Sequence, residues 1–237
     1  MKKERCTAIV LAAGQGKRMH TSVQKQFLTL HGYPVLYHSL KVFEESPVDE
    51  IVLVAEAGEL DYCRREIVEK YGFHKVTYIV AGGKERYHSV YEGLKAAKGA
   101  DYVLIHDGAR PFVNEAIIAR TLAGARECGA CVAGMPVKDT IKLVGADGFA
   151  TETPERSLVW MIQTPQTFSY ELIYGAYREL IESEKNGYAV NVTDDAMVLE
   201  TMRKCHAKLA EGSYENIKIT TPSDLQIAEL FCTEKEM

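Results

Sequence analysis

The chain has 237 residues, of which 46% are hydrophobic and 26% are charged, a composition typical of a globular protein. This composition excludes a disordered, collagen-like or low-complexity chain. The formal net charge of −5 disfavours a protein built to coat nucleic acid or an anionic membrane, although it is compatible with a local basic pocket.

The length fits one large domain, and we expect a single domain over residues 1–237. The apolar stretch Ala8–Ala13 is too short for the core of a signal peptide, and no apolar run approaches the roughly 18 residues that span a bilayer. The six cysteines include one C-x-x-C pair, Cys128 and Cys131, which we interpret as structural thiols, with a redox or metal pair as the alternative. These features favour a soluble cytoplasmic protein.

Short apolar runs alternate with helix-like segments through the first 135 residues. Each run has its apolar residues at consecutive positions, a pattern typical of strands buried on both faces of a parallel sheet. Between the runs, apolar residues recur at helical spacing, as at Leu36, Leu40 and Phe43, and Asn114 stands where an N-cap would begin a helix. The alternation predicts a doubly wound α/β sheet. The expected strands are Ala8–Ala12, Ile51–Ala55, Thr77–Val80, Tyr102–Ile105 and Cys131–Met135, and the expected helices are Val35–Phe43, Tyr62–Tyr71, Ser89–Ala97 and Glu115–Ala125.

The pattern changes after Met135. Polar and apolar residues alternate over Lys138–Val144, a turn follows at Gly145–Gly148, and a second extended stretch reaches Thr153. This predicts a β-hairpin arm at about 137–156 that leaves the main sheet. Because a two-stranded ribbon is barely stable alone, it needs a packing partner, either another subunit or this chain's own sheet. The remaining expected elements are helices Ser169–Glu184 and Asp194–Lys204, a strand at Ala207–Leu209 and a helix after Pro222.

A glycine-containing loop, LAAGQGKRM at residues 11–19, directly follows the first expected strand. Gly14 and Gly16 allow the backbone to approach an anion, and Lys17, Arg18 and Lys25 add positive charge suited to a triphosphate. The spacing is not that of a Walker A motif. The alternative is an ordinary tight turn with solvated charges.

Two further loops follow expected strands. In HDGARP at residues 106–111, Asp107 is placed to hold a divalent metal at a strand's carboxyl end; the alternative is a turn aspartate paired with Arg110. In GGKERYHSV at residues 82–90, two glycines allow close backbone approach and Ser89 can hydrogen-bond a base edge. The alternative for this loop is a plain turn with Ser89 facing solvent.

Cations and hydroxyls also gather beyond the sheet, in VKDTIK at residues 137–142, around Arg156, in QTPQ at 163–166, in TDDA at 193–196 and in NIKITTP at 216–222. Together they suit a second anionic ligand, a phosphate ester with hydroxyls, although each taken singly reads as a surface or capping residue. The sequence contains no G-x-S-x-G, H-E-x-x-H or kinase motif set. A reaction that needs only positioned phosphates, a metal and cations fits what remains.

The motifs LAAGQGKRM, KQF, GGKERYHSV, HDGARP, VKDTIK, QTPQTF, TDDA and NIKITTP, in this order, resemble the 2-C-methyl-D-erythritol 4-phosphate cytidylyltransferases. The resemblance implies a Rossmann-like nucleotidyltransferase sheet. It also implies an enzyme that joins CTP to methylerythritol phosphate with loss of pyrophosphate, in non-mevalonate isoprenoid synthesis. The alternatives are the related ribitol 5-phosphate enzyme and a non-catalytic nucleotide-binding module. The segments GGKERYHSVYEGL and LVWMIQTPQTF look nearer the methylerythritol branch.

The resemblance also implies roles at matching positions. Arg18 and Lys25 would bind the triphosphate and stabilise the transition state, Lys218 would hold the α-phosphate region, and Asp107 would bind Mg²⁺, or Mn²⁺ in its place. The expected nucleotide-binding residues are Ala12, Ala13, Gly14, Gly16, Gly83, Ser89 and Asp107. The expected acceptor-binding residues are Thr140, Arg156, Thr164 and Arg110, with Asp194 or Asp195 in a matching motif.

The family's arm reaches into a neighbouring subunit, so the resemblance implies a homodimer whose sites are shared. Three positions depart from the family pattern: His20 stands where glycine is usual, Gln24 where proline is usual, and Lys84 where an acidic residue is common. We expect Gln24 to leave Lys25 more mobile than proline would. At Lys84 we expect the family's acidic contact to the base to be missing, with backbone contacts to the base retained.

Overall fold

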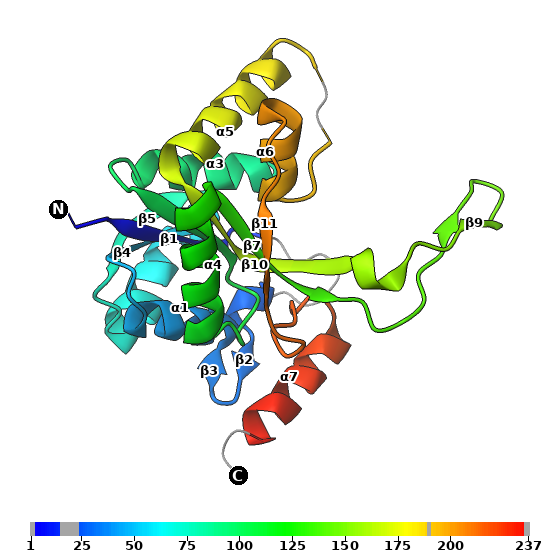
Figure 1. Cartoon of the computed structure of the whole chain (residues 1–237). Helices are drawn as coiled ribbons and strands as arrows, with labels where there is room; N and C mark the ends of the chain where they lie inside the picture. The colour runs from blue at the N-terminus through cyan, green and yellow to red at the C-terminus, as the bar shows by residue number, and fades with distance from the viewer. Residues whose placement is uncertain (1–2, 15–23, 189–190, 235–237) are drawn as a thin grey trace.

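The computed structural model describes residues 3–14, 24–188 and 191–234 (Figure 1). Its largest sheet has seven strands in the order β11-β7-β10-β6-β1-β4-β5. All neighbouring strands run parallel except β10, which is antiparallel to both β6 and β7. The mostly parallel, doubly wound sheet predicted from the sequence is confirmed. Its strands are β1 (Cys6–Ala12), β4 (Glu50–Ala55), β5 (Val76–Ala81), β6 (Tyr102–Asp107), β7 (Ala130–Pro136), β10 (Trp160–Ser169) and β11 (Lys208–Glu211).

Helices cover both faces of this sheet, as Figure 1 shows. In β1, Ile9 packs into the core under α3, α5 and α6, whereas Ala8 and Val10 pack into the core under α1 and α4. Because successive strand residues point to opposite faces, a strand covered on both faces has an unbroken apolar sequence. The helices are α1 (Val35–Glu45), α2 (Leu60–Tyr62, continued by π-helical turns over Cys63–Glu69), α3 (Arg86–Ala96), α4 (Glu115–Cys128), α5 (Tyr170–Lys185), α6 (Asp195–Arg203) and α7 (Pro222–Glu234).

The element boundaries agree with the sequence-based expectation within a few residues. Asn114 is the N-cap of α4, where its side-chain oxygen accepts a hydrogen bond from the Ile117 N–H at 3.0 Å, and Gly129 ends the helix with φ of +83°. The C-x-x-C pair, Cys128 and Cys131, consists of two free thiols. Over the described parts of the chain, no helix has the length and apolarity needed to cross a membrane.

Strand β10 was not expected, because its central residues are polar. Gln163, Thr164, Gln166 and Thr167 are all buried, and the Thr164–Pro165 peptide bond within the strand is cis. The short hairpin of β2 (Thr29–Leu30) and β3 (Tyr33–Pro34) was also not expected.

The hairpin arm is present and extends away from the main sheet (Figure 1), but its strands are shorter than predicted. They are β8 (Leu143–Val144) and β9 (Ala150–Glu152), so the stretch from Lys138 to Lys142 is not part of the ribbon. A ribbon this short gains little from its own backbone pairing. Its position therefore has to be stabilised by other contacts.

Candidate active site

Two adjoining cavities lie at the carboxyl ends of β1 and β6. The chain runs from β1 outward through β4 and β5 on one side, whereas β6 lies on the other side of β1. Open α/β sheets bind their ligands at this kind of reversal in strand order. The larger cavity has a volume of about 590 Å³ and the smaller about 230 Å³. Arg86, Asp107 and Lys218 line both, so the cavities share one wall.

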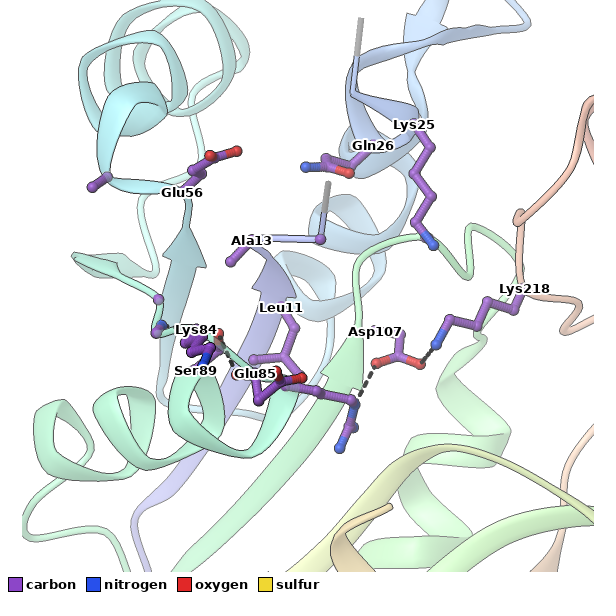
Figure 2. A pocket seen from close by; sticks show the side chains of 16 residues that line it. Leu11, Ala13, Lys25, Gln26, Glu56, Lys84, Glu85, Ser89, Asp107 and Lys218 are labelled. Carbon is purple, nitrogen blue, oxygen red and sulfur yellow. Dashed lines mark hydrogen bonds and ion pairs between the residues drawn. The ribbon is translucent and has the colours of Figure 1, made fainter. Parts of the chain in front are cut away.

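Loops after β1 and β5 form one side of the larger cavity, which Figure 2 shows. The two loops touch, because a Cβ atom added to Gly82 would lie 2.6 Å from the Cβ atom of Ala13. A side chain at Gly83 would likewise collide with His88. Ser89 lies below this contact, and its hydroxyl accepts a hydrogen bond from the Gly83 N–H at 3.1 Å. The two glycines thus allow a close approach that a larger residue would prevent.

The structure brings most of the expected nucleotide-binding residues to this cavity: Ala13, Gly14, Lys25, Gly83, Ser89, Asp107 and Lys218 line it. Figure 2 shows the Lys25 side chain extending from the turn Lys25–Phe27 toward Asp107 and Lys218. Ala12 is instead buried beneath the cavity, where its carbonyl accepts a hydrogen bond from the Gln26 side chain at 2.5 Å. Four positions that the sequence singled out lie outside the described residues, namely Gly16, Lys17, Arg18 and His20.

Asp107 is the central group of the shared wall. One carboxylate oxygen lies 2.8 Å from the Lys218 Nζ and 3.9 Å from the Arg110 Nε, and the other lies 3.3 Å from the Arg86 Nε. Burial by itself would raise the pKa of this carboxyl, but the three positive charges outweigh burial and hold its pKa well below its usual range. Asp107 is therefore an ionised carboxylate at neutral pH, and each of its oxygens lies against a cation of the shared wall.

Arg86 was not expected as a site residue. Its two terminal nitrogens bind the two oxygens of Asp195 at 2.8 Å each, and Asp195 is fully buried. Asp195 also accepts a hydrogen bond from the Tyr177 hydroxyl at 2.5 Å, and the backbone N–H of Asp195 donates to the Gln166 side chain. Both charged residues lie in motifs that the sequence pointed to, GGKERYHSV and TDDA. Their pairing joins positions 109 residues apart, so no local pattern could have indicated it.

The smaller cavity contains two of the expected acceptor-binding residues, Arg110 and Thr164. Arg110 donates to the Asn216 carbonyl at 2.8 Å, and its buried Nε has no hydrogen-bond partner in the described part of the chain. The Thr164 hydroxyl accepts a hydrogen bond from the Asp107 N–H at 3.1 Å. Asp194 lines this cavity as well and caps α6 by accepting from the Met197 N–H.

The other two expected acceptor-binding residues, Thr140 and Arg156, lie in the arm and are exposed. Neither of them lines the larger or the smaller cavity. The Arg156 guanidinium instead donates to the Lys138 carbonyl at 3.2 Å. A single chain therefore does not assemble the full set of expected residues.

Two of the three residues that depart from the family pattern, Gln24 and Lys84, lie in the described part of the chain. Gln24 has φ of −63°, the value that proline would fix, and its side chain donates to Glu56 at 2.6 Å. Its side chain also accepts from Gln26, so the turn that carries Lys25 has side-chain contacts that a proline could not make. Lys84 lies in the wall of the larger cavity.

His106 supports the site from below. It is fully buried against the Phe43 ring, and its two ring nitrogens face the Thr164 hydroxyl at 3.0 Å and the Arg110 carbonyl at 3.2 Å. A neutral ring that donates to the carbonyl and accepts from the hydroxyl satisfies both contacts. Burial lowers the pKa of His106 to about 4.

This low pKa predicts a pH-dependent stability. In the unfolded chain a histidine with pKa about 6.5 binds a proton, whereas folded His106 does not bind one until about pH 4. The contribution of neutral His106 to stability is therefore complete above pH 6.5 and is lost as the pH falls toward 4. Between pH 7 and pH 5 it amounts to about 2 kcal/mol of the free energy of unfolding.

Urea denaturation at pH 7 and pH 5, in the presence of a chelator, tests this expectation. The loss of stability between the two pH values should be about 2 kcal/mol smaller in His106→Gln than in the wild type. His206→Gln, at an exposed position, controls for replacing a histidine. An equal loss in wild type and His106→Gln would contradict the assignment of a buried neutral His106.

Comparison with known proteins agrees with this geometry. A sequence profile of the family "2-C-methyl-D-erythritol 4-phosphate cytidylyltransferase" matches residues 6–234. Proteins of that name from Lachnoclostridium phytofermentans and Clostridium kluyveri are 47% and 49% identical, over 98% of both chains in the first case and over 96% of this chain and 97% of the relative in the second.

A solved structure described as the 4-diphosphocytidyl-2C-methyl-D-erythritol synthase of Anaerococcus prevotii superimposes with a TM-score of 0.85 at 34% identity, covering 97% of this chain and 96% of the other. The cytidylyltransferase structure from Francisella tularensis has a TM-score of 0.78 at 26% identity, covering 96% and 99%. The fold, the paired cavities and the full-length similarity agree, and the chain belongs to the 2-C-methyl-D-erythritol 4-phosphate cytidylyltransferase family.

Proposed function

We propose that this chain transfers the cytidylyl group of CTP to 2-C-methyl-D-erythritol 4-phosphate, releasing pyrophosphate, in non-mevalonate isoprenoid biosynthesis. The observation that carries this proposal is the pair of cavities that share Arg86, Asp107 and Lys218, in a chain of this family. A protein that only bound a nucleotide would need the larger cavity alone. A second polar cavity against the same charged wall is what a transfer between two phosphates requires.

The larger cavity suits CTP. The backbone after β1 at Ala13 and Gly14 would hold the nucleotide from one side, and Gly83 and Ser89 would hold the base and ribose from the other. Lys25 and Lys218 would bind phosphate oxygens, together with Arg18 by resemblance. Fixed cations that face the reacting phosphorus stabilise the charge that develops in the transition state, and they need not move a proton.

The smaller cavity suits the phosphate end of the acceptor, with Arg110 and Thr164 as its binding groups. An anionic oxygen of the acceptor phosphate would attack the α-phosphorus of CTP in line with the departing group. The new P–O bond forms as the bond to the β-phosphate breaks, and pyrophosphate leaves. The attacking oxygen is already ionised, so the site needs no general base to activate it.

Asp107 fits a role in holding Mg²⁺, with Mn²⁺ as an alternative. Its carboxylate is ionised and lies where both cavities meet. The described residues offer no cluster of three or more histidine, cysteine or acidic ligands, so phosphate oxygens and water would complete the coordination. When bound, the ion would offset the negative charge of the phosphates.

We further propose that the chain acts as a homodimer through its arm. Val144, Phe149 and Leu158 are 61%, 74% and 77% exposed, which is unfavourable for large apolar side chains unless a partner covers them. Arg156 and Thr140 lie on the same arm and outside their own chain's cavities. A symmetric pair would bring each arm to the other subunit's acceptor cavity.

Pyrophosphate release from CTP and Mg²⁺ tests the proposed reaction, with methylerythritol 4-phosphate and ribitol 5-phosphate as rival acceptors. We expect a kcat/KM at least about 100-fold higher for the first acceptor, since a polar pocket strongly rejects a misfitting polyol. Preference for ribitol phosphate would contradict the acceptor assignment. Release with neither acceptor would contradict the proposed reaction.

Complementation between two impaired variants, assayed with polyol phosphate far below the KM of Arg156→Ala, tests the shared site. Lys25→Ala should lower kcat by about 100-fold or more, since it removes a cation from the transition state, and Arg156→Ala should chiefly raise KM for the polyol phosphate. When the two variants are co-expressed, a mixed dimer has one site with both changes and one with neither. Activity should therefore return to roughly a quarter of the wild-type value.

The matched control is Lys41→Ala, which removes an exposed lysine on α1 away from both cavities and should leave turnover unchanged. Co-expressed variants that stay as inactive as each variant alone would show that each arm serves its own chain. A monomeric wild-type protein in solution would contradict the dimer directly.

A further inference from the structure

The ion pair between Arg86 and Asp195 is the most deeply seated charged contact of the site. Asp195 is fully buried, and its two oxygens accept one hydrogen bond each from the terminal nitrogens of Arg86. The Tyr177 hydroxyl binds the same carboxylate from below, and Gln166 accepts from the backbone N–H groups of Asp195 and Ala196. The guanidinium of Arg86, at the start of α3, is thus held in one position by a network of residues from α5, α6 and β10.

The opposite side of the same guanidinium faces the ligand cavities. Arg86 lines both of them, and its Nε donates to Asp107 at 3.3 Å. Three of its five N–H groups are engaged in this way, and within the described ranges the other two have no hydrogen-bond partner. A fixed cation with two unused donors between two cavities is suited to bind phosphate oxygens.

A structural role alone explains this arrangement poorly. Burying two charges costs desolvation energy that their attraction often fails to recover, so apolar residues would stabilise the fold at least as well. The residues that line both cavities are two cations, Arg86 and Lys218, and one carboxylate, Asp107. This shared wall therefore carries one more positive than negative charge, at the place where two anionic ligands would meet and repel each other.

We propose that Arg86 contacts the phosphates of both ligands and is the charge that allows CTP and the acceptor phosphate to bind side by side, with Asp195 as the positioning residue that holds Arg86 there. This inference rests on the proposed function and deepens it. Without Arg86, we expect each ligand still to bind when it is the only ligand present. When both are present, we expect each to weaken the binding of the other.

The variants must separate this role from one in folding. Arg86→Gln alone leaves Asp195 buried without its cation, which is strongly destabilising. Arg86→Gln/Asp195→Asn removes both charges, so no uncompensated charge remains in the interior. Glu179→Gln is the matched control, since it breaks the arginine–carboxylate ion pair between Glu179 and Arg203, outside both cavities.

The measurement is calorimetric binding of α,β-methylene CTP, which cannot react, with and without saturating methylerythritol 4-phosphate, and separately with and without inorganic phosphate. In wild type and Glu179→Gln we expect the second ligand to change the Kd of the CTP analogue by less than about threefold. In Arg86→Gln/Asp195→Asn we expect the second ligand to raise the Kd of the CTP analogue by at least about tenfold. A thermal unfolding curve of the double variant checks that it is folded.

The inference would be overturned if the double variant bound both ligands together as well as wild type does. It would also be overturned if the double variant had a higher turnover than Arg86→Gln. Failure of wild type to bind either second ligand beside the CTP analogue would overturn it too. The two proposals can fail separately. If wild type releases no pyrophosphate with any acceptor, the proposed function fails. If joint binding of the CTP analogue and inorganic phosphate is nevertheless lost only in the double variant, the role of Arg86 stands.

Discussion

The site depends on one buried carboxylate surrounded by cations. Asp107 lies at the end of β6 within ion-pair distance of Arg86, Arg110 and Lys218, which come from three different parts of the chain. An isolated carboxylate at this depth would bind a proton, and isolated cations would repel one another. Each charge is stable there because of the others, so the loops after β6 and β11 and the start of α3 converge on one point.

This convergence explains why two cavities share one wall. The larger cavity is formed by the ends of β1 and β5 and the smaller by β10 and the loop before α6, with Asp107 between them. In the proposed reaction both reacting groups are phosphates, so the chemistry consists of placing negative charges close together. A wall with fixed positive charge, seated before any ligand arrives, lowers the energy of that arrangement without a proton transfer. The buried polar network behind Arg86 and the neutral His106 behind Thr164 provide that rigidity.

Much of the fold could be predicted because its strands are buried on both faces and therefore have continuous apolar sequences. The same reasoning missed β10, because its buried residues include polar ones that line the smaller cavity and hydrogen-bond to Asn216 and Asp194. Three sequence motifs contain Asp107, Ser89 and Lys218, and the structure brings these residues together in the lining of one cavity. They could not reveal the pairing of Arg86 with Asp195, which depends on how α3 and α6 pack rather than on any local spacing.

The arm shows a different limit. Its existence followed from alternation and a turn signal, but the stretch before Leu143 is not paired, and Thr140 and Arg156 lie outside the cavities of their own chain. A sequence describes one chain, whereas a shared site is a property of two. The proposed dimer reconciles the exposed apolar arm with an acceptor cavity that lacks part of its expected residues.

The most direct test is a structure determined with α,β-methylene CTP and methylerythritol 4-phosphate bound together. We expect the triphosphate in the larger cavity and the acceptor phosphate in the smaller one. Arg86 and Lys218 should lie between the two phosphates, and Arg156 of a second copy of the chain should contact the acceptor. An acceptor phosphate bound away from the wall formed by Asp107, or both phosphates bound in the larger cavity, would contradict it.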